Sequence, residues 1–396
     1  MADTDRIKRV AERVAAAKRE GHDVVVVVSA MGKTTDELLR QAQDISSIPP
    51  GRELDMLLTA GERISMALLA MAMHEQGYTA RSLTGSQAGI ITDAAHGKAR
   101  IIDITPGRIH TALSEGHVVI VAGFQGVSRD SKDVTTLGRG GSDTTAVALA
   151  AALGAAVCEI YTDVDGVYTA DPRLVPNARR LTRLSHDEML EMAASGAKVL
   201  QVRSVEYARN HGVTISVRSS FTDTEGTVVD EGTDMEQAII TAVAHDTGEG
   251  KLVIRGVPDK PGVAARVFTA LAEENVNIDM IVQNVSEDGT TDISCTLPLA
   301  DGPRATKLLE ALLPEIGAQG INFDTDIAKV SLVGAGMKTH PGVAAAMFSC
   351  LSDAAVNIEM ISTSTIRISV VIREADVVPA VQAIHERFGL SSEMSV

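Results

Sequence analysis

The most constraining feature of this 396-residue sequence is an internal repeat in its C-terminal part. The stretches 261–281 and 341–361 are offset by 80 residues, and 12 of their 21 aligned positions are identical. In each copy a Pro-Gly pair precedes an amphipathic helix pattern, and a strand beginning Val-Asn-Ile follows. A repeat of this length is one supersecondary unit, so the pattern predicts two ferredoxin-like βαββαβ units.

The second unit lacks an obvious last strand, because its C-terminal residues are short and polar. An uncovered sheet edge is open to unwanted pairing. The apolar stretch 238–245 precedes the first copy and has no other assignment. We expect it to complete the second unit, so that the two units are interleaved. The predicted segments are 250–327 for the first unit, and 238–246 with 328–396 for the second.

The first half of the chain alternates helical and extended patterns, which predicts an α/β sandwich with a largely parallel sheet over residues 1–222. A polar, glycine-rich linker is expected at 223–237. The first expected helix lies between a cap at Asp3 or Thr4 and a stop at Gly21. Further helices are expected at 53–76, at 142–153 and after the capping box 185–188. The expected strands are 23–32, 78–84, 117–123, 157–162 and 213–218.

Charge and composition exclude several classes of partner. With 36 basic and 52 acidic side chains the formal charge is −16, and Trp is absent, so no nucleic acid is expected to bind. The longest apolar run of the first half, 24–28, is far shorter than the roughly 20 residues of a membrane span, so no membrane is expected as a partner. Without an apolar leader, a cytoplasmic location is expected. Cys158, Cys295 and Cys350 are interpreted as reduced core residues.

Residues 31–35 superficially suggest a nucleotide P-loop. Val27, however, stands where that motif needs its first glycine. The other interpretation is a strand end that opens onto a helix N-terminus, where N–H groups and the hydroxyls of Ser29, Thr34 and Thr35 hold an anion. Helix capping explains any single one of these hydroxyls equally well.

The stretch 135–146 is more specific. Its three glycines let the backbone approach a ligand, and Arg139 among them offers a fork for a carboxylate or phosphate. Ser142 or Asp143 then begins a helix. A flexible turn with a solvated arginine is the alternative.

Three further places combine charge with a demanding position. The loop 161–173 follows a strand end, where open α/β sheets bind ligands, and its Asp163 and Asp165 fit an ordinary turn or a divalent cation. Glu62 lies in an apolar helix and needs either a cationic substrate group or a salt bridge. Lys198 lies near a helix start, which disfavours a cation unless an anion such as phosphate is present.

Together these motifs resemble the aspartate kinase family over essentially the whole chain. The resembling stretches are 28–39, 54–65, 123–126, 135–146, 161–173, 196–200 and the two repeat copies with 283–286 and 361–364. The resemblance implies an amino-acid-kinase-like fold followed by two ACT domains. It also implies that MgATP phosphorylates the side-chain carboxylate of L-aspartate to 4-phospho-L-aspartate, the first step of lysine, threonine and methionine biosynthesis.

The resemblance also implies roles for individual residues. Ser29, Thr35, Glu62 and Arg139 would bind aspartate, with Arg139 on a carboxylate and Glu62 on the ammonium group. Arg139, Ser142 and Asp143 would form the catalytic set beside the transferring phosphoryl group. Thr162, Asp163, Tyr168, Arg173 and Lys198 would bind the nucleotide, and no separate set of metal ligands is assigned. Positioning and charge neutralisation would then provide the rate.

The repeat also predicts regulation by a small amino acid. Asn277 and Asn357 occupy equivalent positions, and the helix start after 259–262 offers N–H groups to an α-carboxylate. The candidate effector residues are Asp259, Asn277, Gln283, Asn284, Ser286, Asn357, Ser362 and Thr363. A polar, solvent-facing strand is the alternative. The resemblance implies lysine and/or threonine as effectors, and a homo-oligomer or hetero-oligomer formed through the ACT domains.

One departure affects the expected activity. Relatives open with a strand and a Lys-[Phe/Tyr]-Gly-Gly-[Ser/Thr] loop, which has no counterpart in this sequence, and Thr365 stands where many have Glu. We expect a start assigned too late, and poor phosphorylation of aspartate by the chain that begins at Met1. A catalytically impaired regulatory subunit is the alternative, and another amino acid kinase, such as a glutamate or carbamate kinase, is a weaker one because those lack this ACT pair.

Overall fold

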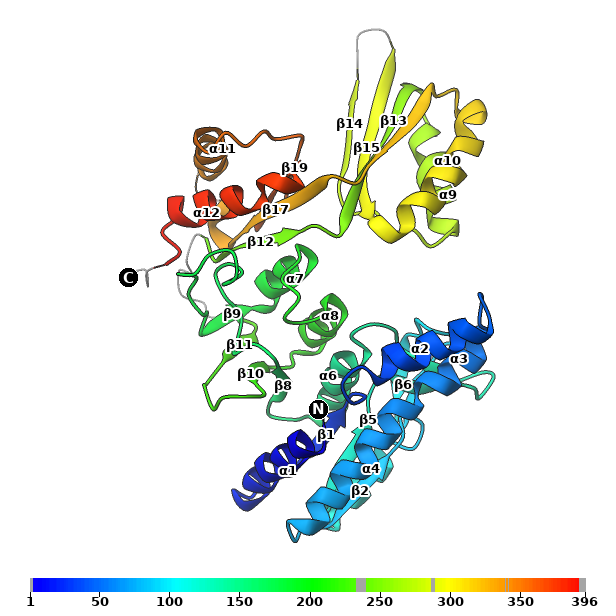
Figure 1. The fold of residues 1–396 in the computed structure, drawn as a ribbon, viewed down its shortest axis with the longest axis vertical. Coiled ribbons are helices and arrows are strands. Elements are labelled where there is room, and N and C mark those ends of the chain that lie inside the picture. Colours follow the sequence, from blue (N-terminus) through cyan, green and yellow to red (C-terminus); the bar gives the residue numbers. More distant parts are fainter. Residues whose placement is uncertain (1–2, 233–239, 286–288, 339, 341, 392–396) are drawn as a thin grey trace. The chain divides into compact units, whose positions relative to one another are not determined.

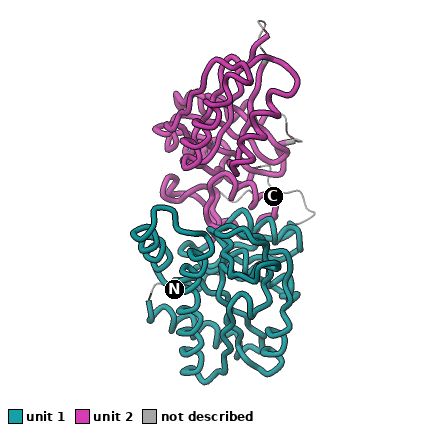
Figure 2. Tube along the Cα trace, turned by 90° about the vertical axis from the view of Figure 1, so that its right-hand side faces the viewer, with its two compact units in different colours: residues 1–165, 200–232 teal, residues 166–199, 233–396 magenta. Residues whose placement is uncertain are grey.

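The computed structural model describes residues 3–232, 240–285, 289–338, 340 and 342–391 (Figure 1). The chain divides into two compact units, residues 1–165 with 200–232 and residues 166–199 with 233–396 (Figure 2). The predicted domain end at 222 does not coincide with this division. Residues 166–199, expected in the first domain, pack with the repeat instead.

The first unit is built around short strands covered by helices. Its helices are α1 (Thr4–Arg19), α2 (Thr34–Ile45), α3 (Gly51–Leu58), α4 (Ala60–Glu75), α5 (Gly107–Ser114), α6 (Gly141–Leu153) and α8 (Val202–His211). Its strands are β1 (Val25–Val28), β2 (Ala80–Leu83), β3 (Ile90–Thr92), β4 (Ile101–Ile104), β5 (Val118–Ala122), β6 (Gln125–Ser128), β7 (Val134–Thr136), β8 (Cys158–Thr162), β10 (Ile215–Ser219) and β11 (Thr227–Asp230).

The centre of this unit is a parallel sheet in the order β1-β5-β2. All five residues of β5 are fully buried, as expected for a β-branched strand with both faces covered. A second sheet has the order β4-β3-β6-β7, with β3 and β6 parallel. Elsewhere, β8 and β10 pair in parallel and β11 joins β10 antiparallel.

Two expectations for this region need correction. The predicted linker 223–237 contains the strand β11, which pairs with β10 and whose residues alternate between buried and half-buried. The single helix expected over 53–76 is broken at Thr59 into α3 and α4. By length and composition the stretch 51–75 could cross a membrane. Within this stretch, α4 packs against α1 and β5 with Leu69 fully buried, so we assign it to the core of this unit.

The predicted helix caps are present in the structure. Asp3 caps α1 by accepting from the N–H of Arg6 at 2.8 Å, and Gly21 beyond the helix has a φ of 91°. Ser185 and Glu188 form the predicted capping box. The three cysteines are buried and free, as predicted.

The second unit contains the repeat and the segment 166–199. Its helices are α7 (His186–Ala194), α9 (Val263–Glu273), α10 (Gly302–Ile316), α11 (Val343–Asp353) and α12 (Val377–Arg387). Its strands are β9 (Arg183–Ser185), β12 (Ala242–Asp246), β13 (Glu249–Pro258), β14 (Ile281–Val285), β15 (Thr290–Pro298), β16 (Gly320–Asp324), β17 (Ile327–Val333), β18 (Met360–Thr363) and β19 (Arg367–Arg373).

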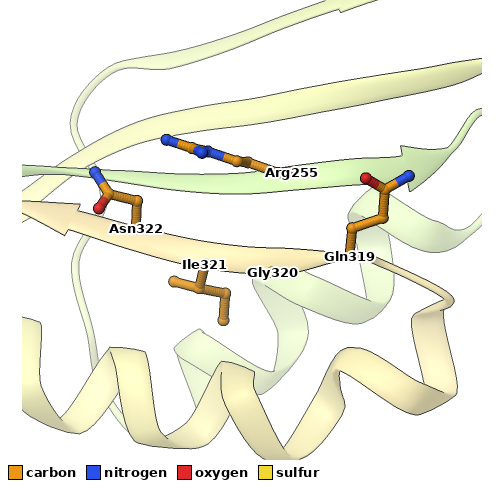
Figure 3. A pocket seen from close by; sticks show the side chains of 5 residues that line it. All are labelled: Arg255, Gln319, Gly320, Ile321 and Asn322. Carbon is orange, nitrogen blue, oxygen red and sulfur yellow. The ribbon is translucent and has the colours of Figure 1, made fainter.

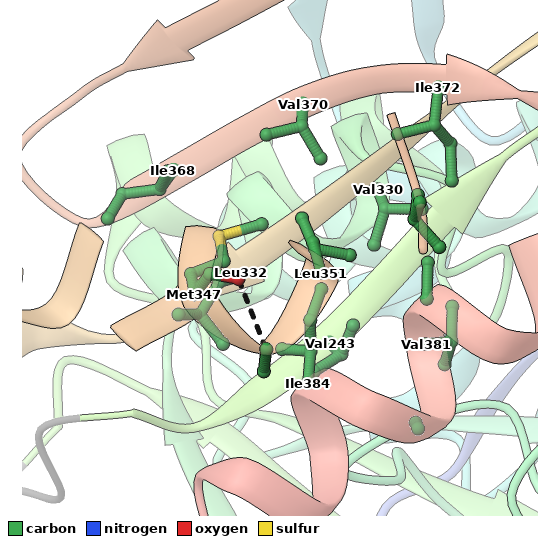
Figure 4. Packing of buried hydrophobic residues seen from close by; sticks show 14 of the residues in the cluster. Val243, Val330, Leu332, Met347, Leu351, Ile368, Val370, Ile372, Val381 and Ile384 are labelled. Atoms are coloured by element: carbon green, nitrogen blue, oxygen red, sulfur yellow. Dashed lines mark hydrogen bonds between the residues drawn. The ribbon is translucent and has the colours of Figure 1, made fainter. Parts of the chain in front are cut away.

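Each repeat copy has its own four-stranded antiparallel sheet, in the orders β14-β15-β13-β16 and β12-β17-β19-β18. The strand β12, which precedes the first copy in sequence, pairs with β17 of the second, from Ala242 opposite Val333 to Asp246 opposite Lys329. The core of the second copy lies between this sheet and helices α11 and α12 (Figure 4).

The strands after Val-Asn-Ile begin later than expected. β14 starts at Ile281 and β18 at Met360, so Asn277 and Asn357 lie in the preceding loops. Each helix is followed by a left-handed residue, Asn275 with a φ of 55° and Ala355 with a φ of 58°, and the backbone then stays irregular until the strand begins. The two copies thus share the same turn.

Candidate active site

Glu62 lies in the first turn of α4 and is 3% exposed. Its Oε1 accepts a 3.1 Å hydrogen bond from the N–H of Ala30, which follows β1. Its Oε2 is buried and has no hydrogen-bond partner among the described residues. Burial raises the pKa of this carboxyl above its usual range, and hydrogen bonds from the backbone offset only part of that effect. The site therefore favours a cationic group beside Oε2.

The end of β1 and the start of α4 are in unusually close contact. A Cβ added at Gly61 would lie 2.7 Å from Cβ of Ala30 and 3.5 Å from Cγ2 of Thr34. The structure thereby brings Glu62 next to the segment 29–35. Ser29 is exposed directly after β1, and Thr35 is half-buried in the first turn of α2.

The loop between β7 and α6 requires its glycines. Gly138 and Gly140 have left-handed φ values of 78° and 71°. A Cβ at Gly140 would lie only 2.1 Å from Cγ of Gln201. Arg139 between them is exposed and has no ion-pair partner in the described part of the chain. Its guanidinium is therefore available to an anionic ligand.

Helix α6 begins directly after this loop. Its N-cap residue, Gly140, makes no side-chain hydrogen bond to the first turn, so the N–H groups there lack a side-chain cap. Asp143 lies in that turn, and burial raises its pKa to about 6. A Cβ at Gly123, just after β5, would lie 2.8 Å from Oγ of Ser142. The end of β5 and the start of α6 therefore meet.

The predicted nucleotide residues fall in both units. In the first unit, Thr162 ends β8 and its Oγ1 contacts Oδ1 of Asp163 at 3.1 Å. In the second unit, Tyr168 forms an isolated antiparallel bridge with Arg180. The exposed residues Arg173 and Lys198 also belong to that unit, and Lys198 lies in the turn between α7 and α8.

The segment 166–199 is joined to the repeat by contacts that the sequence did not indicate. Within the segment, Arg173 pairs with Asp171 at 2.6 Å and lowers the pKa of the Asp171 carboxyl. Two contacts with the repeat come from Thr169. The backbone oxygen of Thr169 accepts from the N–H of Val243 in β12 at 2.8 Å. The hydroxyl of Thr169 lies 3.0 Å from Nε2 of His385 in α12. The predicted nucleotide loop is thus attached to the second repeat copy.

The two repeat copies exchange ion pairs, which we call the cross-copy pairs. Asp279 of the first copy pairs with Lys329 of the second, and Glu359 of the second pairs with Lys251 of the first. The two carboxylates occupy equivalent positions after Val-Asn-Ile, and the two lysines occupy equivalent positions at the start of β13 and β17. Each copy therefore contributes one carboxylate and one lysine, at equivalent positions, to an ion pair with the other copy.

The two cross-copy pairs differ in their surroundings. Lys329 is fully buried and also donates to Oε1 of Glu249 at 2.7 Å and to the backbone oxygen of Ala194 in α7 at 3.3 Å. Burial acts to lower the pKa of Lys329, but the charges of Glu249 and Asp279 outweigh it and raise the pKa. Nearby, Arg367 pairs with Glu191 of α7 at 3.1 Å. Of the two cross-copy pairs, the Lys329 pair contacts α7, and no contact of the Lys251 pair with α7 occurs among the described residues.

Of the candidate effector residues, Asp259 precedes α9, Asn277 and Asn357 lie in the loops after the repeat helices, and Gln283, Asn284, Ser362 and Thr363 lie on β14 and β18. Helices α9 and α11 begin after left-handed glycines, Gly262 and Gly342, whose side-chain positions face open space. Neither helix has a side-chain cap, so first-turn N–H groups remain for an anion. Asn277, Gln283, Asn284, Asn357 and Thr363 are exposed, as is Asp259, and Ser362 is half-buried. Ser286 lies outside the described residues.

Two cavities occur elsewhere. One, of about 320 Å³, lies over β13 and β16 and is lined by Arg255, Gln319, Gly320, Ile321 and Asn322 (Figure 3). Ile321 points toward the helix layer, whereas Arg255 and Asn322 extend from the other face of the sheet. The second, of about 410 Å³, lies between residues 175–177 and α12. No predicted site residue lines either cavity.

Comparison with known proteins decides the family. The amino acid kinase family matches residues 1–219, and the ACT domain matches residues 251–313 and 330–388. The aspartokinase of Mycolicibacterium smegmatis is 61% identical over 398 residues, covering 99% of this chain and 94% of the relative. The chain belongs to the aspartokinase family. The aspartokinase of Corynebacterium efficiens is similar at 59% identity over 394 residues, covering 98% of this chain and 94% of the relative.

Solved aspartokinase structures agree with the fold. Escherichia coli aspartokinase III in complex with aspartate and ADP has a TM-score of 0.82 at 25% identity, covering 98% of this chain and 97% of the other. Aspartate kinase from Synechocystis has a TM-score of 0.54 at 42% identity, covering 100% of this chain and 68% of the other. As an aspartokinase, the chain is an enzyme that uses ATP to phosphorylate aspartate, with an amino acid kinase fold followed by ACT domains.

Proposed function

We propose that Glu62 and Arg139 bind the ammonium group and the α-carboxylate of L-aspartate. The observation that carries this proposal is Oε2 of Glu62, which is buried and has no hydrogen-bond partner among the described residues, so that it would accept a cation. The ammonium group of aspartate supplies that charge, and the guanidinium fork of Arg139 donates hydrogen bonds to the α-carboxylate. Ser29 and Thr35, which border the same segment, complete the substrate contacts. The side-chain carboxylate is then left free to react.

Phosphoryl transfer in this site is a matter of position and charge. An oxygen of the aspartate side chain attacks the γ-phosphorus as the bond to the ADP oxygen breaks, so negative charge develops on the transferred group. The uncapped first turn of α6, with Ser142, presents N–H groups and a helix dipole to that charge. Thr162, Asp163, Tyr168, Arg173 and Lys198 hold the nucleotide.

Mg²⁺ fits this arrangement as the companion of ATP. Among the described residues no three His, Cys, Asp or Glu side chains gather into a metal cage. Mg²⁺ needs none, because it is commonly held by one or two carboxylates together with substrate phosphates. Asp143, whose buried carboxyl has a raised pKa, is the residue that would hold it. When bound, the ion neutralises charge on the phosphates.

We propose lysine and/or threonine as feedback effectors bound at the ACT domains. The uncapped starts of α9 and α11 offer N–H groups to an α-carboxylate. The exposed amides of Asn277 and Asn357, and Gln283 on β14, supply side-chain partners for a small amino acid. Feedback requires only that the effector bind the less active arrangement more tightly, by about 1–3 kcal/mol. Assembly into oligomers through these domains is part of the same proposal.

Glu62→Gln tests the aspartate site directly. The amide keeps the size and the hydrogen bond from Ala30 but cannot neutralise an ammonium group. Loss of a charged partner at a buried site costs about 2–4 kcal/mol, so aspartate affinity measured by isothermal titration should fall by about 30-fold or more. ADP affinity should stay within about twofold, because no nucleotide contact is assigned to Glu62. Unchanged aspartate affinity would contradict the assignment.

A further inference from the structure

The loop 137–141, which carries Arg139, is held from one side by a buried carboxylate. Asp55 of α3 is 1% exposed, and its Oδ1 accepts a 2.6 Å hydrogen bond from the hydroxyl of Thr136 at the end of β7. The same Oδ1 accepts a 3.1 Å hydrogen bond from the N–H of Gly97. The residue that precedes the loop is therefore anchored in the core.

From the other side, Arg203 in the first turn of α8 reaches the main chain of the loop. Its Nη1 donates to the backbone oxygen of Leu137 at 2.9 Å, and its Nη2 donates to that of Ala99 at 2.7 Å. Ala99 in turn donates its N–H to the backbone oxygen of Thr136 at 2.9 Å. One planar guanidinium thus ties together the two segments that meet beneath the loop.

The surroundings of Arg203 show that it does not serve an ordinary ion pair. It is half-buried, and within the described ranges no carboxylate lies at ion-pair distance. The planar guanidinium of Arg203 donates to the carbonyls of Leu137 and Ala99 at the same time, and a lysine ammonium does not reproduce this geometry. The neighbouring residue Gln201 packs against Gly140, so the start of α8 contacts the loop at two points.

We propose that Arg203, together with Asp55, positions the 137–141 loop so that Arg139 is held ready for the substrate carboxylate. This inference rests on the role of Arg139 under the proposed function. Arg203 acts through Arg139 and does not touch substrate itself. A displacement of about 1 Å in a substrate-binding group can change the rate about a hundredfold. The hydrogen bond from Arg203 to Leu137, two residues before Arg139, and the one to Ala99, which supports Thr136, are therefore expected to have a measurable effect.

Steady-state kinetics of Arg203→Met, Arg203→Lys and Arg139→Ala test this inference. Arg203→Met should raise KM for aspartate about tenfold or more while KM for ATP stays within about twofold. Arg203→Lys keeps the charge but not the fork, so its KM for aspartate should stay within about threefold of the Met variant. The matched control is Arg209→Met, which removes an exposed arginine from the same helix and should leave both constants unchanged.

The decisive measurement is Arg203→Met in the Arg139→Ala background. Because Arg203 acts through Arg139, the added substitution should there change KM for aspartate less than about twofold. An equal effect in both backgrounds, or full recovery by Arg203→Lys, overturns the inference while leaving the aspartate site intact. If Arg139→Ala alone leaves KM for aspartate unchanged, the proposed site itself fails, and the inference with it.

Discussion

Replacing Lys329 by methionine should destabilise the second unit far more than the same replacement at Lys251. The side chain of Lys329 has no exposure and three partners. The side chain of Lys251 is 16% exposed, and Glu359 is its one partner among the residues that the structure describes. Glu249 is only 9% exposed, and among the described residues its Oε2 has no partner and its carboxylate pairs with Lys329 alone, so losing Lys329 leaves this charge uncompensated there. Removing one member of a buried pair costs about 3–5 kcal/mol.

The Lys251 variant provides the matched comparison. Its partner Glu359 also pairs with Arg373 at 2.6 Å, so the carboxylate stays compensated, and the expected cost is about 1 kcal/mol. A third variant, Lys329→Met with Glu249→Gln, removes the stranded charge and should recover at least half of the loss, because a buried ion pair replaced as a whole is often nearly neutral.

Hydrogen exchange followed by mass spectrometry is the appropriate assay, because it reports on β17 without assuming that the whole chain unfolds in one step. Peptides covering 327–333 should exchange about a hundredfold faster or more in Lys329→Met, and about fivefold faster in Lys251→Met. Equal acceleration in the two variants would refute the reasoning, as would failure of the Glu249→Gln change to restore protection.

Three further outcomes are expected. Burial raises the pKa of Asp143 from 3.8 to about 6, so the native state binds this proton more tightly than the unfolded state and loses up to about 3 kcal/mol of stability as the pH rises through that window. In urea denaturation, the stability of Asp143→Asn relative to the parent should therefore increase between about pH 4.5 and about pH 7.5. A constant difference would contradict this. Ala355→Gly should raise the midpoint of thermal unfolding, since a left-handed alanine costs about 1 kcal/mol. Asn275→Gly at the equivalent turn should change the midpoint less. The reverse order would show that no backbone strain is stored at Ala355. Gln283→Trp should raise the lysine or threonine concentration needed for half-inhibition about tenfold or more, and unaltered inhibition would remove Gln283 from the effector site.

The features of the fold that could be predicted are those set by residues close together in the sequence. The strand β5 and the capping box at Ser185 follow from neighbouring residues, and both were predicted. The sheet β4-β3-β6-β7 was not, because its strands have only three or four residues and carry too short a pattern to detect. The break at Thr59 was also hidden, since helical periodicity continues through it.

The candidate site shows the same limit. The glycines around Arg139 and the awkward charge of Glu62 are visible in the sequence because each residue is unusual for its local pattern. Arg203 and Lys329 are not unusual locally. Their roles depend on partners such as Leu137, 66 residues from Arg203, and Ala194, 135 residues from Lys329, and no periodicity connects such positions.

The pairing of β12 with β17 also bears on how the chain is synthesised. β12 ends at Asp246 and its partner begins at Ile327, so the ribosome makes the whole first repeat copy before β12 can pair. At roughly 5–20 residues per second, this interval of about 80 residues lasts about 4–16 s. During that time the nascent chain exposes the apolar residues of β12 as an unpaired strand, a segment that a chaperone is suited to protect. The first copy therefore folds while the second still waits for its partner strands.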